Sequence, residues 1–261
     1  MRTEGPRAAA SVSVVIPVKD DADELRRCLR ALALQTKRPD QIIVVDNMSS
    51  DESAEVARSA GADVIHCDRP GIPAAAAAGY DAASADLILR LDADCVPAGS
   101  WVAAMSSAAD AHPEASVFAG GARFVDGPRP LRTPLASVYL GAYAIVLLPV
   151  LGHVPLFGSN LGLRRDAWRR VSSSVHRDDP EVHDDLDLSF HLGEHHRIRL
   201  VPGAAMGISM RPFTSASAFR RRVRRGVRTV VIHWPASFPP VRWARLAMRR
   251  AGSVVARRVT R

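Results

Sequence analysis

Two carboxylates stand two positions apart at the end of an apolar run, and their type and spacing suit a divalent cation. Asp92-Ala93-Asp94 directly follows the apolar run 87–91, which is predicted to be a strand. Ligands of open α/β sheets bind outside the carboxyl ends of the strands. Magnesium-like ions are usually held by one or two carboxylates together with substrate phosphates. The pair therefore predicts a metal and phosphate site, although Asp-x-Asp is also common in solvated turns.

Two more acidic clusters could complete such a site. Asp46 ends a second predicted strand, and Asp184 and Asp185 open a helix far along the chain. A carboxylate at a strand end can accept hydrogen bonds from a ribose hydroxyl or a pyrimidine imide, and one beside a hydroxyl can act as its general base. Two simpler explanations stay open. Asp46 could cap the turn that follows it, and the later acids could serve only as negative charge at a helix N-terminus.

Short apolar runs alternate with helical patterns through the first half of the chain. The predicted strands are 12–16, 42–45, 64–65 and 87–91, and the predicted helices are 25–32, 49–61 and 74–83. Strands that alternate with single helices form βαβ units, which build a parallel sheet with helices on both faces. The expected fold class is therefore α/β with a mostly parallel sheet. Ser49 and Glu52 are expected to form a capping box at the start of the second helix.

The second half is less regular and contains a long uncharged segment. Further predicted elements are a helix at 101–111, a strand at 117–125 and a strand at 197–201. The apolar residues 135–151 reach the lower length limit of a membrane span. A single crossing there would place Asp94 and Asp185 on opposite sides of a membrane, which a common active site forbids. We expect this segment to be partly exposed, with burial as a core helix as the alternative.

The basic residues are concentrated at the end of the chain. The formal net charge is +8, and residues 195–261 hold 16 arginines and no acidic residue. Two helical segments, 215–232 and 241–255, place apolar residues among these arginines. Basic amphipathic helices lie in membrane interfaces, so we expect peripheral contact with an anionic membrane. A solvated arginine-rich surface is the alternative. Nucleic acid is not an expected partner, because no recognised binding motif or aromatic stacking platform accompanies the charge.

Cysteine usage and the N-terminal region indicate the compartment. Cys28, Cys67 and Cys95 are scattered and lack metal-ligand spacing, as in reduced cytosolic proteins. The apolar run 12–18 is too short for a signal peptide and contains Pro17. We therefore expect a cytoplasmic protein that is peripheral to the inner face of the cell membrane.

Five segments together carry a resemblance to a known enzyme family. They are Val14-Val15-Ile16-Pro17-Val18-Lys19-Asp20, Val44-Val45-Asp46-Asn47, Asp92-Ala93-Asp94, Gly158-Ser159-Asn160 and His183-Asp184-Asp185-Leu186-Asp187. In this order and at these separations, the chain resembles the family 2 glycosyltransferases of the GT-A fold over residues 11–213. The resemblance implies a Rossmann-like domain that moves a sugar from a nucleotide diphosphate to an acceptor hydroxyl, usually with inversion.

The resemblance also implies roles for individual residues. By this resemblance, the nucleotide-sugar would contact Pro17, Lys19, Asp46 and Asp92, and Asp94 would bind Mn²⁺ or Mg²⁺. The sugar and acceptor would contact Gly158, Asn160 and Asp184. Asp185 would be the catalytic base. A metal acting as Lewis acid would stabilise the leaving diphosphate, and a base would activate the acceptor hydroxyl. Asp94 and Asp185 are therefore expected to meet across one cleft. The expected acceptor is a lipid-linked or cell-envelope glycan.

The chain departs from the family pattern at two places. Alanines at 74–78 stand where many members carry Arg-Asn, and the segment Met206–Arg211 lacks the metal-binding histidine that many members carry after the last strand. The metal would then depend on Asp94, phosphate oxygens and water, with help from Arg211 or an arginine of the tail. A binding-only relative therefore stays open as an alternative. A nucleotidyltransferase fits less well, because the loop after the first strand lacks the expected glycines.

The predicted organisation has three parts. Residues 1–10 are expected to be disordered, 11–212 to form the catalytic domain, and 213–261 to form a basic amphipathic helical tail. Within the catalytic domain, 11–97 is expected to be the nucleotide-binding half and 98–212 the acceptor half.

Overall fold

The computed structural model describes residues 10–213 and 215–259, with side chains for all of these except Pro212 and residues 250–259. The predicted disorder of residues 1–10 falls almost entirely outside the described residues. The strands are β1 (Val12–Val18), β2 (Gln41–Asp46), β3 (Asp63–His66), β4 (Leu87–Arg90), β5 (Val96–Pro97), β6 (Val117–Phe124), β7 (Leu161–Arg164) and β8 (Ile198–Ile208). The helices are α1 (Ala22–Ala33), α2 (Ser53–Ser59), α3 (Ile72–Ala82), α4 (Trp101–Ala111), α5 (Arg132–Leu151), α6 (Arg165–Val171), α7 (Asp184–His195), α8 (Ala216–Ile232) and α9 (Pro239–Val259).

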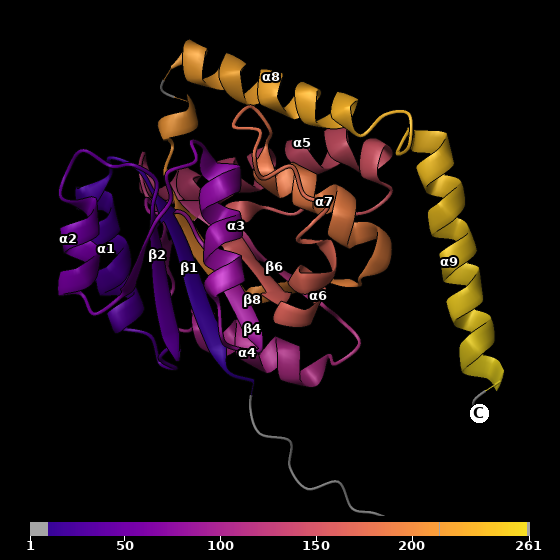
Figure 1. The fold of residues 1–261 in the computed structure, drawn as a ribbon, viewed down its shortest axis with the longest axis horizontal. Coiled ribbons are helices and arrows are strands. Elements are labelled where there is room, and N and C mark those ends of the chain that lie inside the picture. The colour runs from indigo at the N-terminus through magenta and orange to yellow at the C-terminus, as the bar shows by residue number, and fades with distance from the viewer. Residues whose placement is uncertain (1–9, 214, 260–261) are drawn as a thin grey trace, which may run out of the picture.

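The described strands form one sheet of eight, in the order β3-β2-β1-β4-β7-β6-β8-β5 (Figure 1). Strand β1 pairs in parallel with β2 and β4, and β2 pairs in parallel with β3. The parallel α/β arrangement predicted for the first half is therefore confirmed. Strand β7 runs antiparallel between β4 and β6, and this change of direction was not predicted. The sheet also continues across the predicted boundary between the two halves of the catalytic domain.

Helices cover both faces of the sheet (Figure 1). On β1, Val14 and Ile16 pack in one buried cluster with residues of α1 and α4, whereas Val15 packs in the other with residues of α3. Successive side chains of a strand point to opposite faces. Because both faces are covered, the strand reads as a continuous apolar run and not as an alternation of apolar and polar residues.

Helix α3 lies very close to the sheet because its sequence consists of small residues. A Cβ atom on Gly79 would lie 2.3 Å from Cγ1 of Val15 and 2.9 Å from Cγ2 of Val45. Glycine inside a helix is about 1 kcal/mol less favourable than alanine, so the close approach is the reason for it here. This packing brings the first turn of α3 to the carboxyl ends of β1 and β2.

Helix α2 begins later in the chain than the sequence predicted, because of a contact with a neighbouring loop. The expected capping box of Ser49 and Glu52 is wrong, because α2 begins at Ser53. The Ser49 hydroxyl instead accepts a hydrogen bond from the backbone N–H of Asp20, at 3.1 Å. The Ser49 hydroxyl therefore binds the loop after β1 and does not cap the helix.

The apolar segment predicted at 135–151 is helix α5. Residues 129–151 are long and apolar enough to cross a membrane, judged by length and composition alone. In this fold α5 packs along β6 and buries Ala136, Leu147 and Leu151. Val138 and Ile145 remain 69% and 74% exposed. The helix is therefore partly exposed, as predicted.

Two long helices complete the described chain (Figure 1). Helix α8 runs across the top of the view and contacts α7, and α9 descends along one side. The side chain of Arg242 anchors α9, because it is fully buried and donates to the carbonyl oxygens of Leu151 at 2.7 Å and Phe190 at 3.1 Å. The described part of the predicted arginine-rich tail therefore forms two helices joined by residues 233–238, and Arg242 holds the start of α9 against the α/β body.

Candidate functional site

A cleft of about 270 Å³ lies at the carboxyl ends of β1 and β4. Its walls include four of the residues predicted to bind the nucleotide-sugar and metal: Pro17, Lys19, Asp92 and Asp94. Asn47 from the end of β2 and Ile72 and Ala75 from the start of α3 complete it. The cleft is where parallel strands of an α/β sheet are expected to bind a ligand.

The loops that follow β1 and β2 hold each other in place. Asp20 and Met48 adopt positive φ angles of 49° and 59°. The carboxylate of Asp20 accepts hydrogen bonds from the backbone N–H of Ser50 at 2.6 Å and from its hydroxyl at 2.9 Å. Left-handed conformations are uncommon for residues other than glycine and persist when their surroundings enforce them. These crossed bonds therefore fix the rim of the cleft.

Asp46 lies beneath the rim and does not line the cleft. Its side chain is buried and accepts hydrogen bonds from the backbone N–H of Ser49 at 3.1 Å and from His66 at 3.1 Å. The next residue, Asn47, lines the cleft and donates to the carbonyl oxygens of Cys67 and Arg69. The turn-capping role left open for Asp46 is thus present, and its predicted contact with a nucleotide stays a prediction.

Asp94 is the acid placed to receive a cation. Burial, followed by repulsion from Asp92, raises the pKa of Asp94 to about 6, against the opposing charge of Arg211. One oxygen of Asp94 lies 3.2 Å from the guanidinium of Arg211, which also binds Asp21 at 2.6 Å. Arg211 follows the last strand of the sheet, in the segment where many family members carry a histidine. The structure therefore puts a fixed positive charge beside Asp94.

The residues around Asp94 fit a divalent cation. Oxygens of Asp92 and Asp94 and the sulfur of Cys95 lie within 4.8 Å of one another. Hard cations such as Mg²⁺ and Mn²⁺ prefer carboxylate oxygens completed by phosphate and water, so Asp94 is the natural ligand and Asp92 the second. Burial, with repulsion from Asp92 second, raises the pKa of Asp94, and a bound cation would favour its ionised form.

Arg90 joins the two acidic segments. This buried arginine ends β4, and its guanidinium donates to Asp184 at 2.5 Å and to Asp92 at 3.0 Å. Its charge offsets part of the burial effect that raises the pKa of Asp184. The carboxylate of Asp184 is therefore used inside the protein, as a partner of Arg90. The signal in the sequence was an arginine within an otherwise apolar buried strand, which must have a charged partner.

The loop at Gly158 and Ser159 connects these residues to the predicted base, Asp185. A Cβ atom on Gly158 would lie 2.2 Å from Nη1 of Arg90, so only glycine fits. The backbone N–H of Gly158 donates to Asp185 at 2.9 Å. The hydroxyl of the next residue, Ser159, donates to Asp92 at 2.5 Å. Gly158 and Ser159 thus touch both acidic clusters, and Ser159 was not among the predicted site residues.

Asp185 is buried, and its surroundings favour its ionised form. Its Oδ1 atom lies 2.5 Å from Nδ1 of His183, out of line for a hydrogen bond. Burial alone would raise the pKa of Asp185, but the charge of His183 and the hydrogen bond from Gly158 outweigh it and hold the pKa well below its ordinary value. The same pairing raises the pKa of His183. The ionised form is the one that can accept a proton.

Asn160 is buried and hydrogen-bonded within the protein. It is fully buried, its amide donates to the carbonyl oxygens of Gly121 and Ala204 at 2.8 Å each, and its carbonyl accepts from the indole of Trp101 at 2.8 Å. In this conformation Asn160 anchors the loop that contains Gly158. Its predicted contact with the sugar or acceptor stays a prediction.

Two tyrosines and an arginine lie near enough to the base for its charge to raise their pKa values. Burial raises the pKa of Tyr143 well above its ordinary value, and the charge of Asp185 adds to this effect. The guanidinium carbon of Arg222, from α8, lies 5.6 Å from the ring centre of Tyr139. Asp185 is not among the residues that line the cleft at Asp94. The prediction that Asp94 and Asp185 meet across one cleft is therefore not confirmed in this conformation, because Asp185 is buried. The two acidic segments are instead linked through Arg90 and the Gly158 loop.

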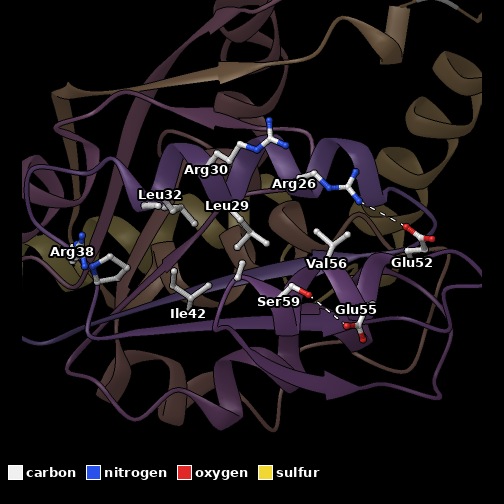
Figure 2. Close-up of a pocket in the computed structure, with 13 residues that line it drawn as sticks. Arg26, Leu29, Arg30, Leu32, Arg38, Ile42, Glu52, Glu55, Val56 and Ser59 are labelled. Atoms are coloured by element: carbon white, nitrogen blue, oxygen red, sulfur yellow. Dashed lines mark hydrogen bonds and ion pairs between the residues drawn. The ribbon is translucent and has the colours of Figure 1, made fainter.

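A second cavity, of about 590 Å³, lies between α1, α2 and β2 (Figure 2). Charged residues at its edge pair with one another, as Arg26 does with Glu52 at 3.8 Å. None of the strand-end acids lines this cavity. It is larger than the cleft at Asp94 but lacks the groups that the predicted chemistry requires.

A family model and several known sequences match parts of this chain. The profile of Glycosyl transferase family 2 matches residues 13–170. A segment of 99 residues is 36% identical to glycosyltransferase AglE of Haloferax volcanii and covers 35% of this chain and 33% of that protein. An uncharacterised glycosyltransferase of Mycobacterium bovis is 36% identical over 87 residues, or 33% of this chain and 38% of that one. The matches thus span about a third of these relatives' length.

Solved structures share the fold. A mannosyltransferase of Pyrobaculum calidifontis, solved with GDP-Man and Mn²⁺, superposes with a TM-score of 0.63 at 18% identity, over 96% of this chain and 77% of that one. Glucosyl-3-phosphoglycerate synthase of Mycobacterium tuberculosis, solved with Mn²⁺, UDP-glucose and phosphoglyceric acid, superposes with a TM-score of 0.55 at 22% identity, over 85% and 80%. The mixed sheet is therefore of the GT-A type, and the chain belongs to glycosyl transferase family 2.

Proposed function

We propose that this protein transfers a sugar from a nucleotide diphosphate to an acceptor hydroxyl, with inversion and with the assistance of a divalent cation. The observation that carries this proposal is the Arg90 bridge, which ties the cation-binding strand end to the helix that bears a buried, ionised Asp185. A leaving diphosphate and a poor hydroxyl nucleophile need these two kinds of group on opposite sides of the reacting carbon.

Each group then has a defined task. The carboxylate of Asp185 accepts the proton of the acceptor hydroxyl while the hydroxyl oxygen forms its bond to the anomeric carbon. The bond from that carbon to the diphosphate breaks, and its electron pair leaves with the phosphate oxygen. A cation on Asp94 would neutralise this developing charge. The Arg211 guanidinium, 3.2 Å from Asp94, lies where it can contribute to the same neutralisation.

The covered state of Asp185 adds a condition to this mechanism. The residue is only 4% exposed, so an acceptor reaches it after Tyr143 or Arg222 moves aside. Residues on α5 and α8 therefore belong to the acceptor side of the site. Closure of such elements over bound substrate also excludes water, which otherwise competes as acceptor.

We further propose that the acceptor is a lipid-linked or cell-envelope glycan, reached by peripheral contact of the protein with the cytoplasmic face of an anionic membrane. Helix α8 turns an apolar stripe outward: Phe219, Val223, Val227 and Val231 are 49–59% exposed. Exposed arginines, among them Arg220 and Arg224, flank this stripe. An apolar stripe with basic flanks suits the interface of an anionic bilayer.

A binding-only relative is the second candidate, and one observation favours it. The Arg211 guanidinium occupies one oxygen of Asp94 and thus competes with a cation. Under this alternative the protein would bind a nucleotide-sugar without cleaving it.

Hydrolysis and binding assays separate the two candidates. UDP-, GDP- and dTDP-sugars are screened by calorimetry with Mn²⁺, and slow hydrolysis of the best binder is followed by release of the nucleotide diphosphate. The proposal expects Mn²⁺-dependent hydrolysis that is lost in Asp94→Ala and in EDTA. Tight binding with no hydrolysis at any metal concentration would establish the binding-only alternative.

A further inference from the structure

Three histidines and an aspartate converge outside the catalytic cleft. His176 lies in the loop before α7, Asp187 and His191 lie on α7, and His233 caps the end of α8. One ligand atom from each of the four lies within 4.8 Å of all the others. The cluster therefore brings together three segments of the chain, one of them in the arginine-rich tail.

The distances suit a tetrahedral metal site. Oδ1 of Asp187 lies 2.7 Å from Nδ1 of His176, 3.2 Å from Nε2 of His233 and 3.6 Å from Nε2 of His191. Ligand atoms roughly 2.0–2.1 Å from a tetrahedral zinc ion lie about 3.3 Å from one another. The three distances from Asp187 bracket this value, and every pair of the four ligand atoms lies within 4.8 Å.

The hydrogen bonds of His233 leave its second nitrogen facing a carboxylate. Its Nδ1 lies 2.7 Å from the carbonyl oxygen of Thr229, which can only accept, so Nδ1 carries the proton. In the neutral ring Nε2 then has a lone pair, and it points towards Asp187. Among the described residues, Nε2 of His233 and Nε2 of His191 are buried with no hydrogen-bond partner. A buried nitrogen without a partner is costly, and a cation between it and the carboxylate removes that cost.

The chemistry of the donors selects the metal. Three imidazoles and one carboxylate are a donor set of zinc and of similar transition metals, whereas Mg²⁺ and Ca²⁺ prefer oxygen throughout. The bond from Nδ1–H of His233 to a backbone carbonyl is the outer partner that orients a metal-ligating histidine. A cavity of about 420 Å³, lined by His191 and His233, gives an ion a path from solvent.

We propose that His176, Asp187, His191 and His233 bind one Zn²⁺ ion, separate from the cation at Asp94. The ion ties the end of α8 to α7, two residues from the base Asp185. Its bound state therefore fixes the arginine-rich helix over the acceptor side of the site.

The test measures metal binding by the full-length, tag-free protein after removal of metals with a chelator. Zn²⁺ is titrated by calorimetry, and Co²⁺ is titrated as a spectroscopic probe. We expect one Zn²⁺ per chain, a rise in Tm on binding, and intense visible absorption bands of tetrahedral Co²⁺. His233→Ala should weaken Zn²⁺ binding by more than the roughly 10–100-fold that loss of an outer partner costs.

Three variants make the result specific. His112→Ala removes a histidine remote from the cluster, and Asp94→Ala removes the catalytic cation ligand; both should bind Zn²⁺ as the wild type does. His176→Gln changes a side chain that is 38% exposed, so it tests the site without removing a core residue. The proposal is wrong if the wild type binds no stoichiometric Zn²⁺, or if His233→Ala and His176→Gln bind it unchanged. Neither outcome depends on sugar transfer.

Discussion

The guanidinium of Arg90 lies 2.5 Å from the carboxylate of Asp184, which is 94 positions further along the chain. Through this bond the end of a central strand is tied to the first turn of α7, and the same guanidinium holds Asp92. The cation site and the base are therefore positioned by one side chain. This relationship is the basis of the first two predictions.

Replacement of Arg90 by alanine should destabilise the protein strongly. Both Arg90 and Asp184 are largely removed from water, with side-chain exposures of 3% and 16%. Removing one partner of a buried ion pair leaves an unpaired charge, which typically costs about 3–5 kcal/mol in the free energy of unfolding. Urea denaturation measures this change. Arg169→Ala, at an exposed position of α6, should stay within about 0.5 kcal/mol of wild type. Equal effects of the two variants would contradict the assigned role of Arg90.

Replacement of Gly158 by alanine should impair catalysis through Arg90. The added Cβ would lie 2.2 Å from the guanidinium, whereas a Cβ on Gly121 would meet nothing within 4 Å. Displacement of a catalytic group by about 1 Å can cost on the order of 100-fold in rate. We expect a loss of this size in kcat/KM for Gly158→Ala and none for Gly121→Ala, measured by nucleotide diphosphate release. Wild-type activity in Gly158→Ala would show that the loop tolerates a side chain.

Replacement of His183 by glutamine should move the acidic limb of the pH–rate profile. The carboxylate of Asp185 must be ionised to accept a proton, so activity falls as pH drops through its pKa. His183 lowers the pKa of Asp185, and its removal raises that pKa. An opposite charge at this distance shifts a pKa by about 1–3 units, so activity should be lost at a pH higher by that amount. His112→Gln is the control, and an unmoved acidic limb in His183→Gln would argue against the pairing.

Charge and apolar surface on α8 should both contribute to membrane binding. Each arginine near an anionic surface contributes about 1 kcal/mol, so Arg220→Gln with Arg221→Gln should weaken binding to phosphatidylserine vesicles by roughly thirty-fold. Val227→Asp should weaken it further, because Val227 is 59% exposed on the outward stripe. Sedimentation with vesicles measures both effects. A matched double variant, Arg30→Gln with Arg38→Gln, removes the same charge near α1. Similar losses of vesicle binding in both double variants would mean that the net charge of the protein, and not the surface of α8, governs binding.

The first half of the fold could be predicted because local sequence and tertiary environment agree. Strands β1, β2 and β4 are apolar on both faces, and the small residues of α3 permit close packing. Strand β7 was missed because Leu161-Gly162-Leu163-Arg164 is short and contains glycine, and its pairing depends on β4 and β6. The helix start at Ser53 was missed because the Ser49 hydroxyl binds the backbone N–H of Asp20, in a loop distant in sequence.

The candidate site was predictable at its strand ends and less so elsewhere. Asp92 and Asp94 follow an apolar strand, which a sequence pattern reveals. The internal role of Asn160 depends on Trp101, Gly121 and Ala204, which no spacing links to it. Likewise, His233 meets Asp187 only because α8 folds back over α7. Contacts between distant segments carry no local signature, so the structure was needed to find them.

The most direct test of the central claim compares sugar transfer by wild-type protein and Asp185→Asn on the best-binding nucleotide-sugar with Mn²⁺. The amide keeps the shape of the side chain but cannot accept the proton. We predict unchanged donor binding by calorimetry and a transfer rate lower by about 10²–10⁴-fold, the usual contribution of a general base. Transfer by Asp185→Asn at the wild-type rate would contradict the assignment of Asp185 as the base.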